Sequence, residues 1–261
     1  MTGREMERYR RQLMLRGFTP EHQYRLKNAT AFVAGVGGLG GTAALYLAVA
    51  GIGRLILAHA GNLTLSNMNR QVLMRENDVG TSRVAQAQET LSSINPDVEV
   101  EVHDTRITRD NVQSLMSNSR IVLSARPNFS ERRVLNQACV ARSLPLVEAA
   151  MNGMEGYLFN VLPRTSACLH CMYPEDDPAW KEMGFPVLGA VSGMLGCMMA
   201  LEAIKLLTGY GKPLLGKMLV FDTVDMEFRK MNIPRNDSCE ICGDGACSGS
   251  AEKTAGALFD R

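Results

Sequence analysis

Residues 31–41 read AFVAGVGGLGG, and this stretch decides the fold. Four apolar residues typical of a strand lead directly into glycines with the G-x-G-x-x-G spacing of nucleotide-binding strand–turn–helix units. Such glycines allow a tight turn and a close approach of phosphate, and the following helix presents free N–H groups to the anion. The stretch predicts a nucleotide loop built by Gly35, Gly37, Gly38 and Gly40. A tight turn that binds no ligand is the alternative.

Strands and helices alternate on both sides of this loop. Apolar periodicity and turn residues predict strands over 30–34, 55–58, 98–102, 120–124 and 145–149. Helices are expected between them, over 42–50, 82–94, 109–116 and 130–142. This alternation is typical of a mostly parallel sheet covered by helices on both faces. The predicted fold class is α/β, a Rossmann-like doubly wound domain.

The regions outside this core are less regular. Short helices are expected over 5–15 and 20–26, a long apolar helix over 189–207, and strands over 157–162, 217–221 and 225–231. We expect one domain over 1–243, divided into N-terminal helices (1–28), a nucleotide-binding half (29–150) and a C-terminal half (151–243). Residues 244–261, which include Cys247, are rich in Gly, Ser and Ala and predict a flexible tail.

Four of the seven cysteines form two Cys-x-x-Cys pairs, Cys168/Cys171 and Cys239/Cys242. The loop within such a pair is too short for a stable structural disulfide, whereas two thiolates can converge on one metal ion. The pairs are far apart in the chain, so one ion would clip two distant segments together. The sequence therefore predicts a structural Zn²⁺ site in a zinc-clipped C-terminal extension. A redox-active pair or simple buried thiols are the alternatives.

Composition argues against several classes of protein. The 28 basic and 27 acidic residues leave a formal net charge of +1, which disfavours a nucleic-acid footprint or a polybasic membrane surface. No uninterrupted apolar run reaches the roughly 20 residues of a membrane-spanning helix. The first residues, MTGREMERYRRQ, are charged and lack the apolar core of a signal peptide. We expect a cytoplasmic protein that binds neither nucleic acid nor membrane.

Several motifs together resemble one family. They are RYRRQ at 8–12, the glycine loop, LSNMNRQ at 65–71, ALEAIK at 200–205 and the two cysteine pairs. Through them, residues 5–243 resemble the ThiF/MoeB/HesA family of bacterial ubiquitin-activating-type proteins, and most of all its HesA branch, which is associated with nitrogen-fixation gene clusters. The resemblance implies a homodimer that binds ATP with Mg²⁺ and adenylates the C-terminal glycine of a ubiquitin-like sulfur carrier.

The resemblance also assigns roles to individual residues. Arg11 matches an arginine that reaches the triphosphate from the partner subunit, and Arg70 matches a second phosphate arginine. Asn67 and Gln71 match the polar neighbours of Arg70. Arg83 occupies the position of a phosphate-binding lysine, so Arg70, Arg11 and Arg83 form the implied catalytic set. The ligands implied for structural Zn²⁺ are the four cysteines Cys168, Cys171, Cys239 and Cys242.

The chain departs from the family at its acidic residues. His59 occupies the position of the acid that holds the ribose, and Gly61 replaces the next acid. The Asp that serves Mg²⁺ aligns with Pro127, beside Arg126. Residues 182–184, where some members carry a reactive thiol, contain no cysteine. The predicted pocket is therefore altered, and another nucleotide or an oxyanion is an alternative to ATP.

Three functions are consistent with these features. The first is a HesA-like nucleotide-binding accessory protein for metallocluster or molybdenum/sulfur cofactor assembly, linked to nitrogenase and working with a cofactor-assembly protein. The second is an adenylyltransferase for a ubiquitin-like sulfur carrier. The third is a catalytically inactive dimeric scaffold. NAD-linked oxidoreduction is disfavoured, because no carboxylate stands at the ribose position.

Overall fold

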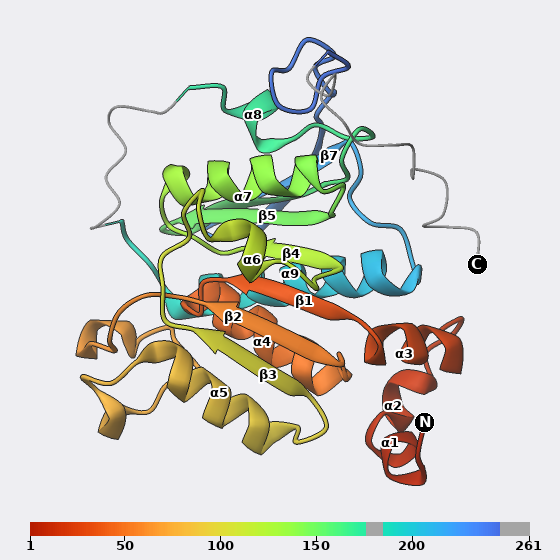
Figure 1. Cartoon of the computed structure of the whole chain (residues 1–261), viewed down its shortest axis with the longest axis vertical. Helices are drawn as coiled ribbons and strands as arrows, with labels where there is room; N and C mark the ends of the chain where they lie inside the picture. The colour runs from red at the N-terminus through yellow and green to blue at the C-terminus, as the bar shows by residue number, and fades with distance from the viewer. Residues whose placement is uncertain (176–184, 246–261) are drawn as a thin grey trace.

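The glycine loop forms the strand–turn–helix unit that the sequence predicts (Figure 1). In this computed structural model, which describes residues 1–175 and 185–245, β1 (Thr30–Ala34) leads into α4 (Gly38–Ala50). Gly35 has a φ of +104°, and a Cβ on Gly40 would collide with the carbonyl oxygen of Gly35. Only glycine fits at these two positions. The helix begins at Gly38, earlier than the predicted residue 42. The predictions for residues 182–184 and for the tail beyond 245, with Cys247, lie outside the described residues.

One eight-stranded sheet runs through the described residues, in the order β3-β2-β1-β4-β5-β6-β7-β8. The neighbours from β3 to β5 are parallel, and those from β5 to β8 are antiparallel. The predicted α/β class with a mostly parallel sheet is confirmed. The remaining strands are β2 (Arg54–Ala58), β3 (Glu99–His103), β4 (Ile121–Ser124), β5 (Leu146–Asn152), β6 (Glu155–Val161), β7 (Lys217–Asp222) and β8 (Glu227–Asn232).

The helices match most of the expected segments; the helix expected over 5–15 is divided at Tyr9 into two short helices. The helix expected over 109–116 is reduced to α6 (Val112–Leu115), because the Asn111 side chain bonds the Thr108 amide and the Arg106 carbonyl and holds a loop instead. The short α8 was not predicted. The other helices are α1 (Gly3–Arg8), α2 (Arg10–Leu13), α3 (Pro20–Lys27), α5 (Arg83–Ile94), α7 (Phe129–Ala141), α8 (Leu169–Met172) and α9 (Gly189–Thr208), with 3₁₀ turns at Leu65–Asn67 and Glu76–Asp78.

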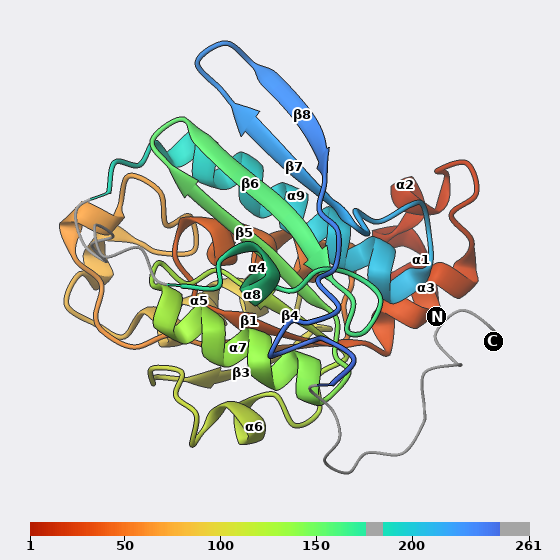
Figure 2. The ribbon, with the colours of Figure 1, turned by 90° about the horizontal axis from the view of Figure 1, so that it is seen from above.

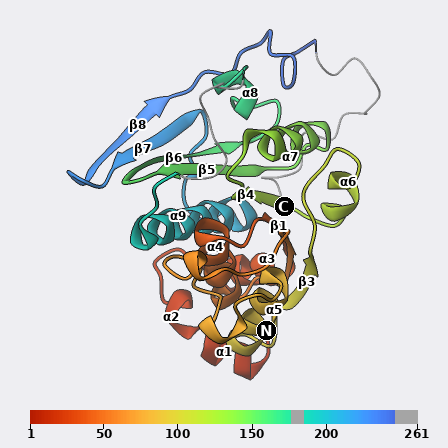
Figure 3. The ribbon, with the colours of Figure 1, turned by 90° about the vertical axis from the view of Figure 1, so that its left-hand side faces the viewer.

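Helices cover both faces of the sheet, and each face has its own core (Figure 3). Ala31 and Val33 of β1 point into the core with α4, α5 and α9, whereas Phe32 points into the opposite core with α6 and α7. Because side chains alternate along a strand, a continuous apolar strand is what a sheet buried on both faces requires.

Among the described helices, α9 alone is long and apolar enough to cross a membrane by length and composition. In the fold it packs along α4 and against β5 and β6, with Leu195 and Met199 fully buried. Its apolar character therefore follows from its place in the core. At the far edge of the sheet the β7–β8 hairpin extends away from the helices (Figure 2), and every residue of β8 is exposed.

Candidate functional site

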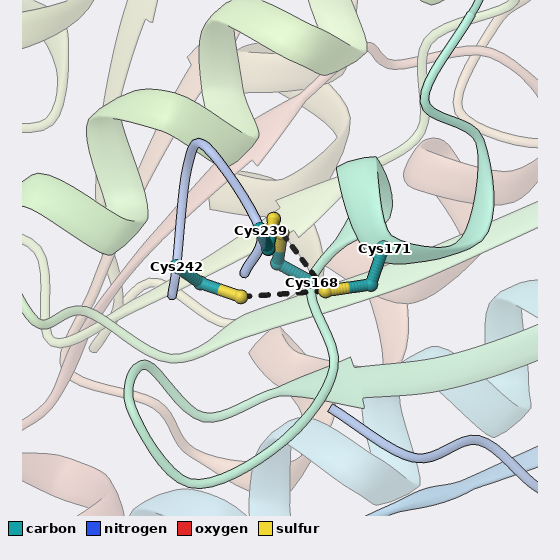
Figure 4. Close-up of side chains that lie close together, drawn as sticks. All are labelled: Cys168, Cys171, Cys239 and Cys242. Carbon is teal, nitrogen blue, oxygen red and sulfur yellow. Dashed lines mark hydrogen bonds between the residues drawn. The ribbon is translucent and has the colours of Figure 1, made fainter. Parts of the chain in front are cut away.

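Four cysteines from two distant segments come together beside α8 (Figure 4). Cys168 caps α8 and Cys171 lies within it, whereas Cys239 and Cys242 lie in the turn after β8. All four Sγ atoms lie within 4.8 Å of one another, and three of the separations are 3.9, 3.8 and 3.4 Å. With Zn–S bonds of about 2.3 Å, a tetrahedral zinc ion places its sulfurs about 3.8 Å apart. The predicted convergence is confirmed, and the donor set fits one tetrahedral metal ion. Zinc as that ion stays a prediction.

The turn that carries the second pair is held by Arg235. Its Nη2 and Nε donate to the carbonyl oxygen of Cys242 at 2.7 and 3.2 Å, and Nη1 bonds Asp237. The amide of Gly243 donates to the carbonyl of Cys239, where any Cβ would collide with backbone. These contacts orient the two thiols toward α8 without using a cysteine side chain.

A separate cavity of about 550 Å³ opens at the carboxyl ends of β1, β2, β4 and β5. It lies where the strand order reverses between β1 and β4, the position at which doubly wound sheets bind ligands. The predicted residues that line it are Gly37, Gly38, His59, Asn67, Arg70, Gln71 and Arg83.

Three predicted residues do not line this cavity. Gly35 and Gly40 shape the turn behind it, which explains their requirement for glycine. Arg11 lies exposed on α2 and does not line the cavity of its own chain. A role for Arg11 in a pocket would therefore need a second subunit.

Other lining residues were not predicted from the sequence. Arg106 and Arg132 reach the cavity from the loop after β3 and from α7, while Val187 comes from the segment just before α9 and Ser192 from the first turn of α9. Arg126 gave a usable signal, since it follows a predicted parallel strand at the edge where ligands bind. No sequence pattern indicated that α9 returns to this edge.

His59 is buried and fixed in one tautomer. Its Nδ1 accepts a hydrogen bond from the Val36 amide at 3.1 Å and lies 3.1 Å from Nη1 of Arg126. Burial, and then the charges of Arg126, Arg83 and Arg106, lower the pKa of His59 to about 2. The neutral ring carries one proton, and because Nδ1 faces two donors this proton lies on Nε2. Within the described residues no hydrogen bond reaches Nε2, and His59 lines the cavity.

Two arginines at the cavity have no carboxylate partner in the part of the chain that the structure describes. Arg70 donates from Nη1 to the Ser66 carbonyl and to Asn69 Oδ1, at 2.9 and 2.8 Å. Arg83 donates to the carbonyls of Gly61 and Ala60, at 3.1 and 2.8 Å. Burial lowers the pKa of both guanidinium groups; for Arg83 the charges of Arg126 and Arg70 add to this shift, and the Asp104 carboxylate opposes it. Both still carry charge at neutral pH, so the cavity attracts anions.

Two further arginines at the cavity form ion pairs with buried glutamates that lie outside the cavity. Arg126 donates from Nε to Glu131 Oε2 at 2.8 Å, and Glu131 also accepts from the Asn128 side chain and the Ile107 amide. Arg132 pairs with Glu148, which is completely buried. Neither Glu131 nor Glu148 lines the cavity. Both arginines therefore present fixed, oriented donors rather than mobile charges.

One polar atom in the wall lacks a partner. Gln71 is 4% exposed, and its Oε1 makes no hydrogen bond among the described residues. A buried, unpaired amide that lines a cavity is what a ligand contact would satisfy. The arrangement does not fit a resident Mg²⁺, because no described lining residue is a carboxylate and Pro127 takes the place of the expected Asp.

Comparison with known proteins shows which family the chain resembles. The ThiF family profile matches residues 9–241. The HesA protein of Leptolyngbya boryana is 55% identical over 246 residues, which cover 94% of this chain and 88% of the relative. The sulfur carrier protein adenylyltransferase of Thermus thermophilus is 36% identical over 253 residues, 93% of each chain.

The fold also has counterparts among solved structures. MccB of E. coli, in complex with MccA-N7isoASN, superposes with a TM-score of 0.83. The match is 24% identical and covers 91% of this chain and 75% of the MccB chain. This likeness supports the architecture described above.

Proposed function

The chain belongs to the ThiF family, as its motifs predict, and from this premise we propose that it is a HesA-like nucleotide-binding accessory protein of metallocluster or molybdenum/sulfur cofactor assembly. We further propose a cytoplasmic location, a link to nitrogenase and a cofactor-assembly protein as partner, on the basis of the HesA relatives. Residues 1–243 are proposed to act as one domain, in which the metal clip lies in the C-terminal half and the nucleotide site is built mainly by the nucleotide-binding half, with Val187 and Ser192 added from the C-terminal half.

The observation that carries the proposal is the arginine-lined cavity at the glycine loop. Gly37 and Gly38 precede and begin α4, so their backbone and the helix N-terminus favour a phosphate there. Arg70 and Arg83 supply positive charge and form no salt bridge with a carboxylate among the described residues. Gln71 offers a buried amide that a bound ligand would satisfy. A nucleotide of the ATP type is proposed to lie with its phosphates between the loop and these two arginines.

A homodimer is part of the proposal. Exposed apolar side chains on α4 and α9 support it: Tyr46, Val49 and Leu201 are 47, 38 and 60% exposed. A second subunit packed on α4 and α9 would remove these side chains from water. In the proposed dimer Arg11 contacts the nucleotide bound to the partner subunit.

An adenylyltransferase is the second candidate, and the Thermus relative favours it. In this reaction a carrier carboxylate oxygen attacks the α-phosphorus of ATP, and pyrophosphate leaves. Arg70 and Arg83 would stabilise the charge that develops on the phosphates. The lining set described above lacks a site for Mg²⁺, so this candidate requires the ion to be held by the nucleotide itself or by residues outside the described segments.

Titration calorimetry with ATP, with and without Mg²⁺, tests the proposal. We expect binding by the wild type and its loss in Arg70→Ala, while Arg75→Ala, at a surface arginine paired with Glu89, keeps it. Absence of heat at every Mg²⁺ level would reject the nucleotide site and favour the inactive scaffold. Release of pyrophosphate when ATP and a sulfur carrier are added would select the adenylyltransferase.

A further inference from the structure

The cavity wall at the end of β2 offers hydrogen-bond donors and hardly any acceptors. This is the position at which a βαβ nucleotide site usually carries an acid, whose oxygens accept from the ribose hydroxyls. Here the residue is His59, and the ring nitrogen that is not already engaged by Val36 and Arg126 is a protonated Nε2. A protonated ring nitrogen donates and cannot accept.

The backbone acceptors beside His59 are also occupied. The carbonyls of Ala60 and Gly61 both accept from the Arg83 guanidinium, which therefore lies directly over the residues that follow His59. Arg126, 8% exposed, holds the other side of the imidazole. A ligand group placed here meets an N–H of His59 and the positive charge of Arg83, while Arg126, paired with Glu131, holds the ring through Nδ1.

The nearby carboxylates do not reverse this charge. Asp104 accepts from the Gly61 amide and from Ser82 Oγ, at 3.2 and 2.5 Å, and does not line the cavity. Glu131 is committed to Arg126, Asn128 and Ile107 behind the wall. Arg83 forms no salt bridge in the described segments, although the Asp104 carboxylate acts on its charge from outside the cavity. The group that best satisfies this corner is one that only accepts, namely a tetrahedral oxyanion.

We propose that His59 and Arg83, with Arg126 holding the orientation of the His59 ring, form a subsite for a phosphate-sized oxyanion at the place where related sites hold ribose hydroxyls. The proposal rests on the proposed nucleotide pocket and names its ligand class more closely. In dinucleotide sites, loss of the acid together with a nearby arginine marks the acceptance of a ribose phosphate. The oxyanion comes either from a phosphate on the ribose of the nucleotide or from a free phosphate bound beside an ordinary ribose.

Calorimetry in EDTA with matched nucleotides tests the subsite. The probes are AMP, adenosine 2′,5′-bisphosphate, adenosine 3′,5′-bisphosphate, and AMP with inorganic phosphate. One bisphosphate is expected to bind at least about tenfold more tightly than AMP, since charge-assisted hydrogen bonds are among the strong ones. Alternatively, added phosphate raises the affinity for AMP to a plateau while neither bisphosphate binds more tightly than AMP. This result assigns the subsite to a free phosphate ion and also supports the proposal.

Other results would overturn it. The subsite is rejected if AMP and both bisphosphates bind with equal affinity and if phosphate has no effect on AMP binding or competes with it. The proposed nucleotide pocket would stand in that case. Failure of every nucleotide to bind rejects the proposed function, and the subsite with it.

Two variants locate the effect. His59→Asp restores an acceptor at the end of β2, and we expect it to abolish the preference for the extra phosphate, measured as the ratio of bisphosphate affinity to AMP affinity. Arg83→Gln removes the charge over the Ala60–Gly61 carbonyls and is expected to reduce the ratio of bisphosphate affinity to AMP affinity. The two variants are independent, so one of them tests the subsite if the other fails to fold. Arg75→Gln, at a surface arginine of similar size, should keep the wild-type ratio. Persistence of the preference in both cavity variants would contradict the assignment.

Discussion

Acidification should destabilise this protein through His59 in particular. The folded protein holds His59 neutral, with a pKa of about 2, whereas the unfolded chain protonates it near its ordinary value of 6.5. The unfolded state therefore binds more protons below pH 6.5, so the free energy of unfolding must fall as the pH falls. Above that value His59 contributes no pH dependence.

The magnitude follows from the two pKa values. Each pH unit below 6.5 costs about 1.4 kcal/mol per proton taken up on unfolding, so from about pH 7.5 to about pH 5 the loss from His59 is about 2 kcal/mol. Any folded pKa below about 4 gives nearly the same loss in this interval. In a chain of this size it corresponds to a fall in Tm of roughly 4–8 °C.

Urea unfolding of the wild type and of His59→Asn at the two pH values measures this contribution. Asn places an acceptor oxygen near the position of Nδ1, so the bond from the Val36 amide can persist. All other titrating groups cancel in the comparison, and the variant should lose about 2 kcal/mol less than the wild type on acidification. An identical loss in both proteins would refute the burial and tautomer assigned to His59.

Three further predictions concern the cavity, the metal cluster and the core. Gly37→Glu should leave the unfolding free energy within about 0.5 kcal/mol of the wild type, since a Cβ there meets nothing nearer than Gln71 Nε2 at 3.9 Å. Its carboxylate should abolish ATP binding in calorimetry, whereas Gly245→Glu binds normally; normal binding by Gly37→Glu would mean that the nucleotide lies elsewhere. Cys239→Ser should lose one tightly held metal ion per chain by elemental analysis, whereas Cys197→Ser, outside the cluster, retains it; equal metal content would exclude the four-cysteine site. Arg132→Met should lower the unfolding free energy by about 3–5 kcal/mol, because it leaves the buried Glu148 without its cation. Adding Glu148→Gln should recover part of that loss in urea unfolding, and a cost below about 1 kcal/mol for the single change would contradict the buried pair.

The sheet was predictable because its signals are local. The parallel strands are short apolar runs or, in β3, an alternating run, each bounded by turn residues, and Gly35 and Gly40 mark a turn that only glycine can make. The helix expected over 109–116 was wrong at its start because the Asn111 side chain competes for backbone groups there. The spacing of the cysteines predicted their convergence because each Cys-x-x-Cys pair supplies two of the four sulfurs that a tetrahedral metal ion needs. The length of chain between the two pairs does not affect this requirement.

The cavity was only partly predictable because it collects side chains from distant segments. Arg70 and Arg83 came from a resemblance of motifs, and Arg126 was noted only as the neighbour of Pro127 in that resemblance. Arg132 gave no signal, because an arginine on a helix usually faces solvent, and here it is buried against Glu148. The tautomer of His59 depends on Val36 and Arg126, and no spacing in the sequence reveals such a contact.

A crystal structure of the full chain grown with ATP is the most direct test of the central claim, that this cavity is a nucleotide site. We predict the nucleotide at the carboxyl ends of β1, β2 and β4, with its phosphates against Gly37 and Gly38 and within reach of Arg70 and Arg83. A cavity that stays empty at saturating ATP, or a nucleotide bound on another surface, would contradict the account.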